Sequence, residues 1–265
     1  MKILTIQDIS CYGSCSCTVA LPILSALGHE TIILPSAILS NHTTGFKEFT
    51  CLDLTEEMPK IVKEWEKLGL KFDAIYTGYI GDERQFDLIL EIKKNLLKKG
   101  GLFIVDPAMA DHGKLYPALN QEIVEGMKKL VSKADLILPN ITEAAFLTGL
   151  PYEENQTDEY INSLIKGLKA MGAKNIVLTS LMKDDLLGAF VLEKGKSSII
   201  LKEKEEKSYH GSGDIFSSVV IGNYLNGDDL KTASDKAADF IIKSIKVTDE
   251  DHWYGLQYEK VLNNH

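Results

Sequence analysis

The sequence predicts an α/β fold: a three-layer α/β/α sandwich with a mostly parallel central sheet and an antiparallel hairpin at one edge. Short apolar segments with the length of strands alternate with longer segments of helical spacing along most of the chain. Strands that helices cover on both faces are expected to be continuously apolar, as these short segments are. Near residue 188 the alternation stops, and two strand-like segments flank the turn-like residues 193–196. That change of pattern predicts the edge hairpin.

Hydrophobic spacing places each element in turn. The expected strands are 2–6, 31–34, 73–77, 102–105, 134–138, 175–179, 188–192 and 198–201. The expected helices are 18–27, 54–68, 86–99, 121–131, 143–147, 158–171, 215–225 and 230–245. Glycine favours the conformation in which many helices end, so Gly28, Gly69 and the pair 100–101 are expected to end three of them. No repeat and no linker rich in proline or serine divides the chain, so we expect a single domain over residues 1–265.

Composition excludes several classes of protein. Of the 265 residues, 45% are apolar and 25% are charged, which is ordinary for a globular chain and not for a disordered or fibrous one. No apolar run approaches the ~18–20 residues that a transmembrane helix needs. The net charge of −9 and the lack of a basic block argue against nucleic acid and anionic membranes as partners. The apolar run after Met1 is too short for a signal peptide, so we expect a cytoplasmic protein.

The four cysteines favour ordinary reduced thiols. Three are crowded together at Cys11, Cys15 and Cys17, and the fourth is Cys51. A disulfide-stabilised secreted domain would have more cysteines in a shorter chain. A structural zinc site usually has paired C-x2-C spacing or nearby histidines. The candidate ligands here are the three clustered cysteines and a distant His42. Zinc and redox sensing are the alternatives, and the sequence assigns no role to the three clustered cysteines.

Polar segments follow several of the expected strands, where an open parallel sheet binds its ligands. These segments are 7–8, 40–43, 77–79, 106–107, 139–140 and 179–180. Because they leave the same edge of the sheet, several of their side chains are expected to converge on one crevice.

The strongest local motif is His-Gly-Ser-Gly-Asp at residues 210–214, directly before an apolar helix. Gly211 and Gly213 let the backbone turn tightly and approach a ligand. The start of a helix presents unpaired N–H groups and a partial positive charge, which suit a phosphate or a developing oxyanion. Asp214 lies in the first turn, where its carboxylate could accept a proton from an attacking hydroxyl. A plain glycine turn before an acidic helix start is the alternative.

Other familiar motifs are absent. Residues 195–197 read Gly-Lys-Ser, but six residues separate Gly188 from Gly195 where a P-loop has four, and a strand rather than a helix follows. No G-x-G-x-x-G follows the first strand, and no G-x-S-x-G, H-E-x-x-H or protein-kinase signature occurs. The motif at 210–214 is therefore the main indication of chemistry.

Two further acids follow strands. Asp106 comes directly after the strand 102–105, and Glu143 lies near the start of the helix after Pro139. A carboxylate at a strand end could hold Mg²⁺ through water, because Mg²⁺ takes few direct carboxylate ligands and keeps several waters. The alternative for Asp106 is a turn before proline. The alternatives for Glu143 are a capping carboxylate at the helix start and a second acid on the metal side.

Six elements occur in the order in which one known family has them. They are Ser40-Asn41-His42-Thr43, Thr77-Gly78-Tyr79, Val105-Asp106-Pro107, Pro139-Asn140-x-x-Glu143, Thr179-Ser180 and Gly211-Ser212-Gly213-Asp214. The chain from Ile3 to about Ile245 resembles pyridoxal kinases, a branch of the ribokinase-like superfamily. The last element is shared across the superfamily. The Ser-Asn-His-Thr and Thr-Gly-Tyr elements are narrower, and they favour pyridoxal kinase over ribokinase or fructokinase.

The resemblance implies a ribokinase-like fold and ATP-dependent phosphorylation of the 5′-hydroxyl of pyridoxal, pyridoxamine or pyridoxine in vitamin B6 salvage. It implies that Asp214 is the catalytic base. It also implies that the N–H groups of Gly211, Ser212 and Gly213 form the anion hole for the transferred phosphoryl group.

The resemblance also implies the ligands of the site. Asp106 and Glu143 would organise Mg²⁺, directly or through water. The residues implied for ATP are Asn140, Glu143, Thr179 and Ser180. The residues implied for the pyridine pocket are His42, Thr43 and Tyr79. Members of the family are typically cytosolic homodimers that bind ATP with Mg²⁺ and often a monovalent cation such as K⁺.

The sequence departs from the family in four places. Many pyridoxal kinases have Gln-Ser after the first strand, with the serine contacting the ring, whereas this chain has Gln7-Asp8. The glycine-bearing stretch at 13–17 and the Ala-Met-Ala at 108–110 also differ, and Leu138 stands where a threonine is common. The first two changes fall in the implied substrate pocket, so Asp8 is expected to be a substrate residue.

Asp8 bears on the choice of substrate. An ionised carboxylate accepts hydrogen bonds and donates none, so Asp8 would favour a cationic substrate such as pyridoxamine. The alternative is that Asp8 points away and caps a neighbouring backbone group. A hydroxymethylpyrimidine-type kinase of the same fold and a non-catalytic ligand-binding relative are the other functions to consider, and the intact residues 211–214 argue against the second. The sequence does not rank the vitamers, identify the monovalent cation or establish the oligomeric state.

Overall fold

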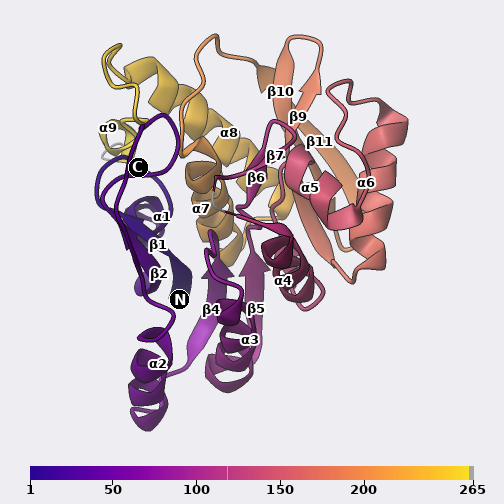
Figure 1. The fold of residues 1–265 in the computed structure, drawn as a ribbon. Coiled ribbons are helices and arrows are strands. Elements are labelled where there is room, and N and C mark those ends of the chain that lie inside the picture. Colours follow the sequence, from indigo (N-terminus) through magenta and orange to yellow (C-terminus); the bar gives the residue numbers. More distant parts are fainter. Residues whose placement is uncertain (118, 263–265) are drawn as a thin grey trace.

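A computed structural model describes residues 1–117 and 119–262, and its main feature is a nine-stranded sheet with helices on both faces (Figure 1). The strands of this sheet are β1 (Lys2–Ser10), β2 (Glu30–Leu39), β3 (Cys51–Asp53), β4 (Phe72–Thr77), β5 (Leu97–Val105), β8 (Leu136–Ile137), β9 (Asn175–Lys183), β10 (Leu186–Glu193) and β11 (Lys196–Glu203). Their order across the sheet is β11-β10-β9-β8-β5-β4-β1-β2-β3. Two short strands, β6 (Ala110–Asp111) and β7 (Lys114–Leu115), form a separate antiparallel pair.

The centre of the sheet is parallel and both of its edges are antiparallel. Parallel pairing runs from β2 through β1, β4, β5 and β8 to β9. β10 and β11 form a hairpin whose turn residues, Lys194 and Gly195, have positive φ angles of 48° and 81°, as two-residue hairpin turns often do. The expected three-layer fold and its edge hairpin are confirmed. β3, at the opposite edge, is missing from the predicted elements, because its three residues are all exposed and carry no buried pattern.

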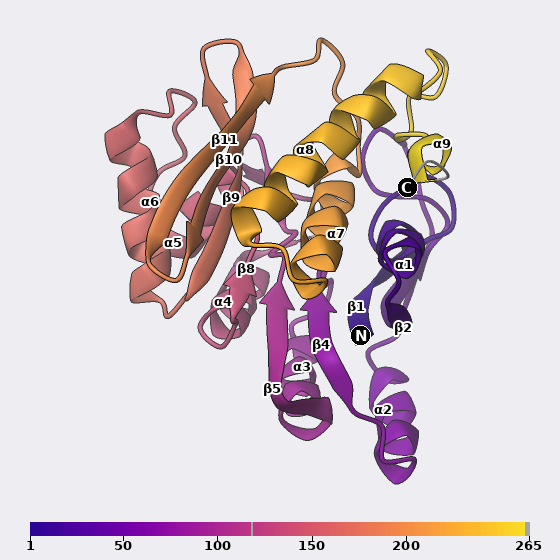
Figure 2. The same cartoon turned by 180° about the vertical axis from the view of Figure 1, so that it is seen from behind.

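Helices cover both faces of the sheet. They are α1 (Cys17–Ala26), α2 (Met58–Lys67), α3 (Arg84–Leu96), α4 (Gln121–Val131), α5 (Ile141–Thr148), α6 (Asp158–Ala170), α7 (Ser212–Leu225), α8 (Leu230–Val247) and α9 (Glu259–Leu262). Leu4 and Ile6 of β1 belong to the core beneath α2 to α6, whereas Ile3 faces α1, α7 and α8. Figure 2 shows α7 and α8 from their side of the sheet. Among the described residues, no helix is long and apolar enough to cross a membrane.

β1, β2 and β9 continue four or five residues beyond their predicted ends. β1 includes Gln7 and Asp8, so these residues lie within a strand and not in a loop after it. β9 likewise continues through Thr179 and Ser180, with a bulge at which Ser180 has a φ of 61°. In β1 and β9, polar residues interrupt the apolar run. The hydrophobic pattern therefore predicted an end for each of these strands that is too early.

The expected helix 86–99 is too long. α3 ends at Leu96, and β5 begins at the next residue, with the glycine pair inside it. Gly100 has a φ of 80°, and a Cβ atom at Gly101 would lie 2.8 Å from the carbonyl oxygen of Asp73. The glycines therefore permit an irregular, close pairing with β4 and do not end a helix. The other predicted helices agree with the structure to within four residues at each end.

Candidate active site

The start of α7 is an uncapped helix end. Gly211, the N-cap residue, has a φ of 77° and no side chain to cap the helix. The N–H groups of Gly213 and Asp214 have no hydrogen-bond partner in the part of the chain that the structure describes. A Cβ atom at Gly211 would lie 1.9 Å from the carbonyl oxygen of Ser14, so the loop after β1 passes directly against this turn. Together these features make a site suited to an anion.

Asp214 lies at the third position of α7, where the sequence predicted it. Its surroundings raise the pKa of the carboxyl group from 3.8 to about 7, mainly because burial disfavours the charged form. A hydrogen bond from the Ser16 backbone acts in the opposite direction, and the nearby Asp8 raises the pKa further. A carboxylate with a pKa near neutrality is suited to accept a proton at physiological pH.

Asp8 is buried close to Asp214. Its side chain is 4% exposed and accepts a hydrogen bond from the Ser10 hydroxyl at 3.0 Å. Burial raises its pKa, while hydrogen bonds from the Ser16 and Ser10 side chains lower it. Apart from its own backbone, the groups that donate hydrogen bonds to Asp8 are thus hydroxyls. The alternative, in which Asp8 caps a neighbouring backbone group, does not describe these contacts.

Asp106 is buried close to both Asp214 and the buried Glu143. Asp106 Oδ2 accepts a hydrogen bond from Ser217 Oγ of α7 at 2.6 Å, and burial together with Asp214 raises its pKa to about 8. Burial and the charge of Asp106 raise the pKa of Glu143 in turn. The four carboxyl groups, which we call the acidic row, are Glu143, Asp106, Asp214 and Asp8. Each of them is perturbed by a neighbour in the row or perturbs one.

Glu143 forms a complete capping box with Asn140. Its Oε2 accepts from the Asn140 N–H at 2.8 Å, and its own N–H donates to Asn140 Oδ1 at 2.9 Å. Its Oε1 accepts from the Met109 N–H at 3.2 Å. The structure thus supports the capping alternative for Glu143, and both of its oxygens already have a backbone donor.

Asp106 and Glu143 have the chemistry of a site for a hard cation. Carboxylate oxygens are the ligands that Mg²⁺ prefers, and two buried acids with raised pKa values would be stabilised in their charged forms by a positive charge beside them. Among the described residues, no group of three or more His, Cys, Asp or Glu side chains is placed to hold a metal. These residues therefore fit an ion that takes most of its ligands from water and phosphate.

The residues expected along the nucleotide lie at the junction of β8, α5 and β9. Asn140 Nδ2 donates to the Ala110 carbonyl at 2.8 Å, so both ends of its amide already have protein partners. The Thr179 N–H donates to the Pro139 carbonyl at 2.8 Å, which joins the loop to β9. Ser180 is exposed at the bulge.

The pocket residues His42 and Tyr79 lie around Asp8 and the start of α7. The His42 ring is 5.6 Å from that of His210, next to Gly211. Burial, and secondarily the charge of Asp8, raises the pKa of Tyr79 to about 12. Thr43 is half-buried beside His42. The structure therefore brings together four residues from two loops, a strand and a helix: His42, Tyr79, Asp8 and Asp214.

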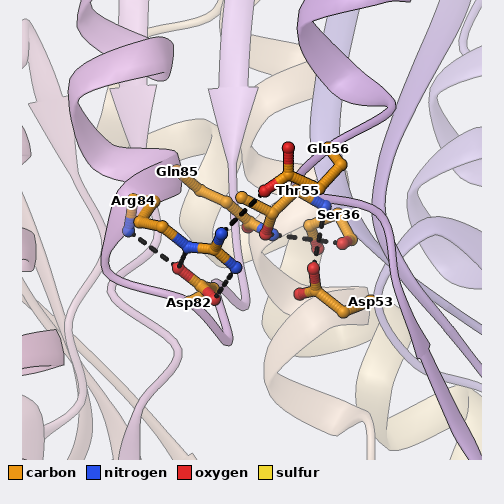
Figure 3. Close-up of polar contacts among 7 residues, drawn as sticks. All are labelled: Ser36, Asp53, Thr55, Glu56, Asp82, Arg84 and Gln85. Carbon is orange, nitrogen blue, oxygen red and sulfur yellow. Dashed lines mark hydrogen bonds and ion pairs between the residues drawn. The ribbon is translucent and has the colours of Figure 1, made fainter.

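Ser36, drawn in Figure 3, connects the loop that carries Tyr79 to α3. Gln85, in α3, donates from Nε2 to the Ser36 carbonyl at 3.2 Å and to Thr55 Oγ1 at 2.8 Å. The Ser36 hydroxyl donates to the Tyr79 carbonyl at 3.4 Å. Because Ser36 belongs to β2, these contacts tie the loop after β4 to a strand two places away in the sheet.

Sequence reasoning missed a set of aromatic residues beside His42. They are Tyr12, Phe46, Trp253 and Tyr254. They come from segments more than two hundred residues apart, so no spacing in the sequence could indicate that they meet. The only local signal is the adjacent Trp-Tyr pair after the last long helix.

Comparison with known proteins decides the family. The phosphomethylpyrimidine kinase family matches residues 21–258. This chain belongs to that family. Its curated relatives include a pyridoxal kinase of Arabidopsis thaliana, 29% identical over 92% of this chain and 80% of the relative. A pyridoxal kinase of Dictyostelium discoideum is 27% identical over 93% of this chain and 86% of the relative. The predicted resemblance to pyridoxal kinases is thus confirmed.

Solved structures agree with this assignment and with the ribokinase-like fold. A candidate phosphomethylpyrimidine kinase from Bacteroides thetaiotaomicron, crystallised with pyridoxal, is 37% identical with a TM-score of 0.94, covering 99% of this chain and 94% of the other. The pyridoxal kinase of Lactobacillus plantarum is 29% identical with a TM-score of 0.90, covering 99% and 95%.

Proposed function

We propose that this member of the phosphomethylpyrimidine kinase family is an ATP-dependent kinase of vitamin B6 salvage. It would phosphorylate the 5′-hydroxyl of pyridoxal, pyridoxamine or pyridoxine. The observation that carries the proposal is the uncapped start of α7, where unpaired N–H groups lie beside a carboxyl group whose pKa is raised to about 7. The names of its relatives, several of which are pyridoxal kinases, support the choice of substrate.

In the proposed reaction, Asp214 takes the proton of the substrate hydroxyl. The hydroxyl oxygen forms a bond to the γ-phosphorus of ATP, the bond from that phosphorus to the bridging oxygen breaks, and ADP leaves. The N–H groups of Gly211, Ser212 and Gly213 hold the transferred phosphoryl group, and the partial positive charge of the helix start stabilises its negative charge. The protein thus acts mainly by positioning groups and neutralising charge, as phosphoryl transfer requires.

Asp106 and Glu143 are the proposed metal-side acids. Mg²⁺ held there through water would neutralise charge on the phosphate oxygens of ATP. Both oxygens of Glu143 accept backbone hydrogen bonds, so Glu143 would act on the metal through its charge. Asp106 is therefore the better candidate of the two for a direct ligand of the metal. The residues proposed along the phosphates of ATP are Asn140, Glu143, Thr179 and Ser180. We also propose K⁺ as a monovalent cation, a homodimeric assembly and a cytoplasmic location.

A magnesium titration tests this part. We expect Asp106→Ala to need a higher Mg²⁺ concentration for half-maximal activity than the wild type. Superimposable titration curves would remove Asp106 from the metal site.

A hydroxymethylpyrimidine kinase is the second candidate function. The family that matches this chain favours it, and so does a hydroxymethylpyrimidine/phosphomethylpyrimidine kinase of Aquifex aeolicus, 28% identical over 72% of each chain. The decisive experiment is an ATP-dependent assay with pyridoxal, pyridoxamine, pyridoxine and 4-amino-5-hydroxymethyl-2-methylpyrimidine. We expect kcat/KM to be highest for a B6 vitamer. A preference for the pyrimidine would establish the second function, and no turnover with any of the four would favour a non-catalytic ligand-binding protein.

A further inference from the structure

The segment that follows α8 packs against the loops around the candidate site. We call residues 249–258 the C-terminal cap, and both views show it beside the loop after β1 (Figures 1 and 2). The Tyr254 ring lies against Tyr12, with centroids 4.7 Å apart. The Trp253 ring lies 4.9 Å from that of Phe46, in the loop after β2. The cap therefore joins two loops that both border the proposed substrate pocket.

The C-terminal cap is a fixed element of the fold. The Tyr258 hydroxyl donates to the Thr18 carbonyl at 2.9 Å, which anchors one end of the cap on α1. Within the cap, His252 Nδ1 lies 2.9 Å from the Gly255 carbonyl oxygen. The position of the Tyr254 backbone between these anchors is thus set by bonds on both sides.

His42 is held between the cap and two other segments. Its Nε2 atom lies 2.9 Å from the Tyr254 carbonyl oxygen, and its ring is 4.9 Å from Phe46 and 5.6 Å from His210. Gly13 has a φ of 88°, and a Cβ atom there would lie 2.2 Å from the His42 ring, so this position has room for glycine only. The imidazole has little freedom to turn in this setting.

The contact with Tyr254 determines which nitrogen of His42 has the proton. A carbonyl oxygen can only accept a hydrogen bond, so Nε2 must donate, and Nδ1 of the neutral ring is then an acceptor. Nδ1 is buried and has no hydrogen-bond partner among residues 1–117 and 119–262. Buried polar atoms are nearly always paired, so this acceptor is matched to a donor that the described residues do not supply.

We propose that the C-terminal cap is a positioning element of the substrate site. The Tyr254 carbonyl holds His42 as the Nε2–H tautomer, and His42 Nδ1 accepts a hydrogen bond from a hydroxyl or N–H group of the bound hydroxymethyl heterocycle. This inference rests on the proposed function for the class of the ligand, but the role of the cap in fixing the imidazole does not depend on it.

Nitrogen NMR of the ligand-free protein tests the tautomer without any assay of activity. The six histidines are labelled with ¹⁵N, and the ring of His42 is assigned by its absence from His42→Gln. We expect the Nε2–H tautomer in the wild type. Addition of pyridoxine without ATP should move the Nδ1 resonance toward that of a hydrogen-bonded acceptor. An Nδ1–H tautomer, or an Nδ1 resonance that saturating pyridoxine leaves unchanged, would overturn the proposal.

Kinetics test the cap itself. Trp253→Ala removes the contact with Phe46, and Trp253→Phe restores an aromatic ring there. Loss of one hydrogen bond to the heterocycle should raise its KM roughly threefold to tenfold, with little change in the KM for ATP. We expect this split for Trp253→Ala, together with a mixture of His42 tautomers, and near wild-type values for Trp253→Phe.

The matched control is Trp65→Ala, which removes the only other tryptophan, on α2, from a T-shaped contact with Phe72 of β4. It should leave both KM values and the His42 tautomer unchanged. Equal increases in both KM values for Trp253→Ala, or an effect of the same kind in Trp65→Ala, would indicate general loosening of the fold and contradict the proposal. If the wild type phosphorylates no heterocycle, the proposed function fails, whereas the ligand-free spectrum still decides the role of the cap.

Discussion

The helices α5 and α7 both begin with an acid in the first turn, but only the first turn of α5 is capped by a side chain. Each has an acid at its third position, Glu143 in α5 and Asp214 in α7. In α5 the N-cap residue is Asn140, whose side chain closes a capping box with Glu143. In α7 the N-cap residue is Gly211, which has no side chain, so the first N–H groups stay unpaired.

This comparison indicates that the N-cap residue determines which role is open to an acid in the first turn of the helix. Where a side chain caps the helix, backbone N–H groups occupy the oxygens of the acid, so the acid is not free to take a proton from a substrate. Where glycine stands instead, the N–H groups remain available to an anion, and the acid has no bond to the N-cap residue. The five predictions that follow test this contrast and the buried acids around α7, starting with the largest effect.

Asp214→Asn should nearly abolish turnover while nucleotide binding survives. The variant keeps the shape of the side chain and cannot accept the proton, and loss of a general base typically lowers the rate ~10²–10⁴-fold. Measured kcat and the affinity for ADP together check this. A variant that keeps more than about a tenth of the wild-type kcat would show that Asp214 is not the base.

Glu143→Gln is the matched control for Asp214→Asn, because it makes the same change at the same position of α5. Its amide oxygen can still accept one of the two backbone bonds. The expected losses are about 0.5–2 kcal/mol of stability and a decrease in kcat at saturating Mg²⁺ at least tenfold smaller than that of Asp214→Asn. Equal losses of kcat in the two variants would contradict the different roles inferred for the acids at the two helix starts.

Gly211→Ala should damage activity far more than Gly149→Ala, although the two glycines have nearly the same φ, 77° and 75°. A methyl group at Gly211 would collide with the Ser14 carbonyl oxygen at 1.9 Å, whereas Gly149, at the end of α5, has nothing within 4 Å. Displacing the start of α7 should lower kcat roughly tenfold to a hundredfold. Gly149→Ala should lose only about 1–2 kcal/mol of stability at unchanged kcat. Urea unfolding and kcat of both variants distinguish strain from collision.

Asp8→Ser should move substrate preference from pyridoxamine toward pyridoxal. Asp8 is buried near Asp214, and its charge contributes to the raised pKa of that carboxyl group. A charged hydrogen bond to the ammonium group of pyridoxamine is worth ~1.5–3 kcal/mol, so the ratio of the two kcat/KM values should change roughly tenfold to a hundredfold. An unchanged ratio would mean that Asp8 does not select substrate.

The stability of the ligand-free protein should fall as pH rises from about 4 to 8. The folded pKa values of Asp214 and Asp106, about 7 and 8, exceed their ordinary value of 3.8, so the folded state binds more protons than the unfolded state in this window. Each group therefore removes at most about 1.4 kcal/mol of stability per pH unit. Thermal unfolding at pH 5.5 and 8 should show a smaller decrease in Asp106→Asn than in the wild type. Glu91→Gln, at an exposed position of α3, is the control and should keep the wild-type pH dependence.

Much of the fold could be predicted because its signals are local. Apolar runs of strand length, helical spacing and turn residues such as Lys194-Gly195 gave the three-layer order and the edge hairpin. Errors occurred where a local signal has two structural meanings. The glycine pair at 100–101 reads as a helix end, but it permits close pairing of β5 with β4. Polar residues such as Asp8 read as a loop, but they continue β1.

The sequence by itself determined the chemistry that α7 offers, because the glycines and Asp214 at its start are contiguous. The tertiary structure decided what surrounds that chemistry. Burial among other acids sets the pKa of Asp214, and a contact across 212 residues, from Tyr254 to His42, sets the state of the imidazole. Hydrophobic period and turn chemistry act over a few residues, whereas desolvation and the meeting of distant side chains exist only once the chain has packed.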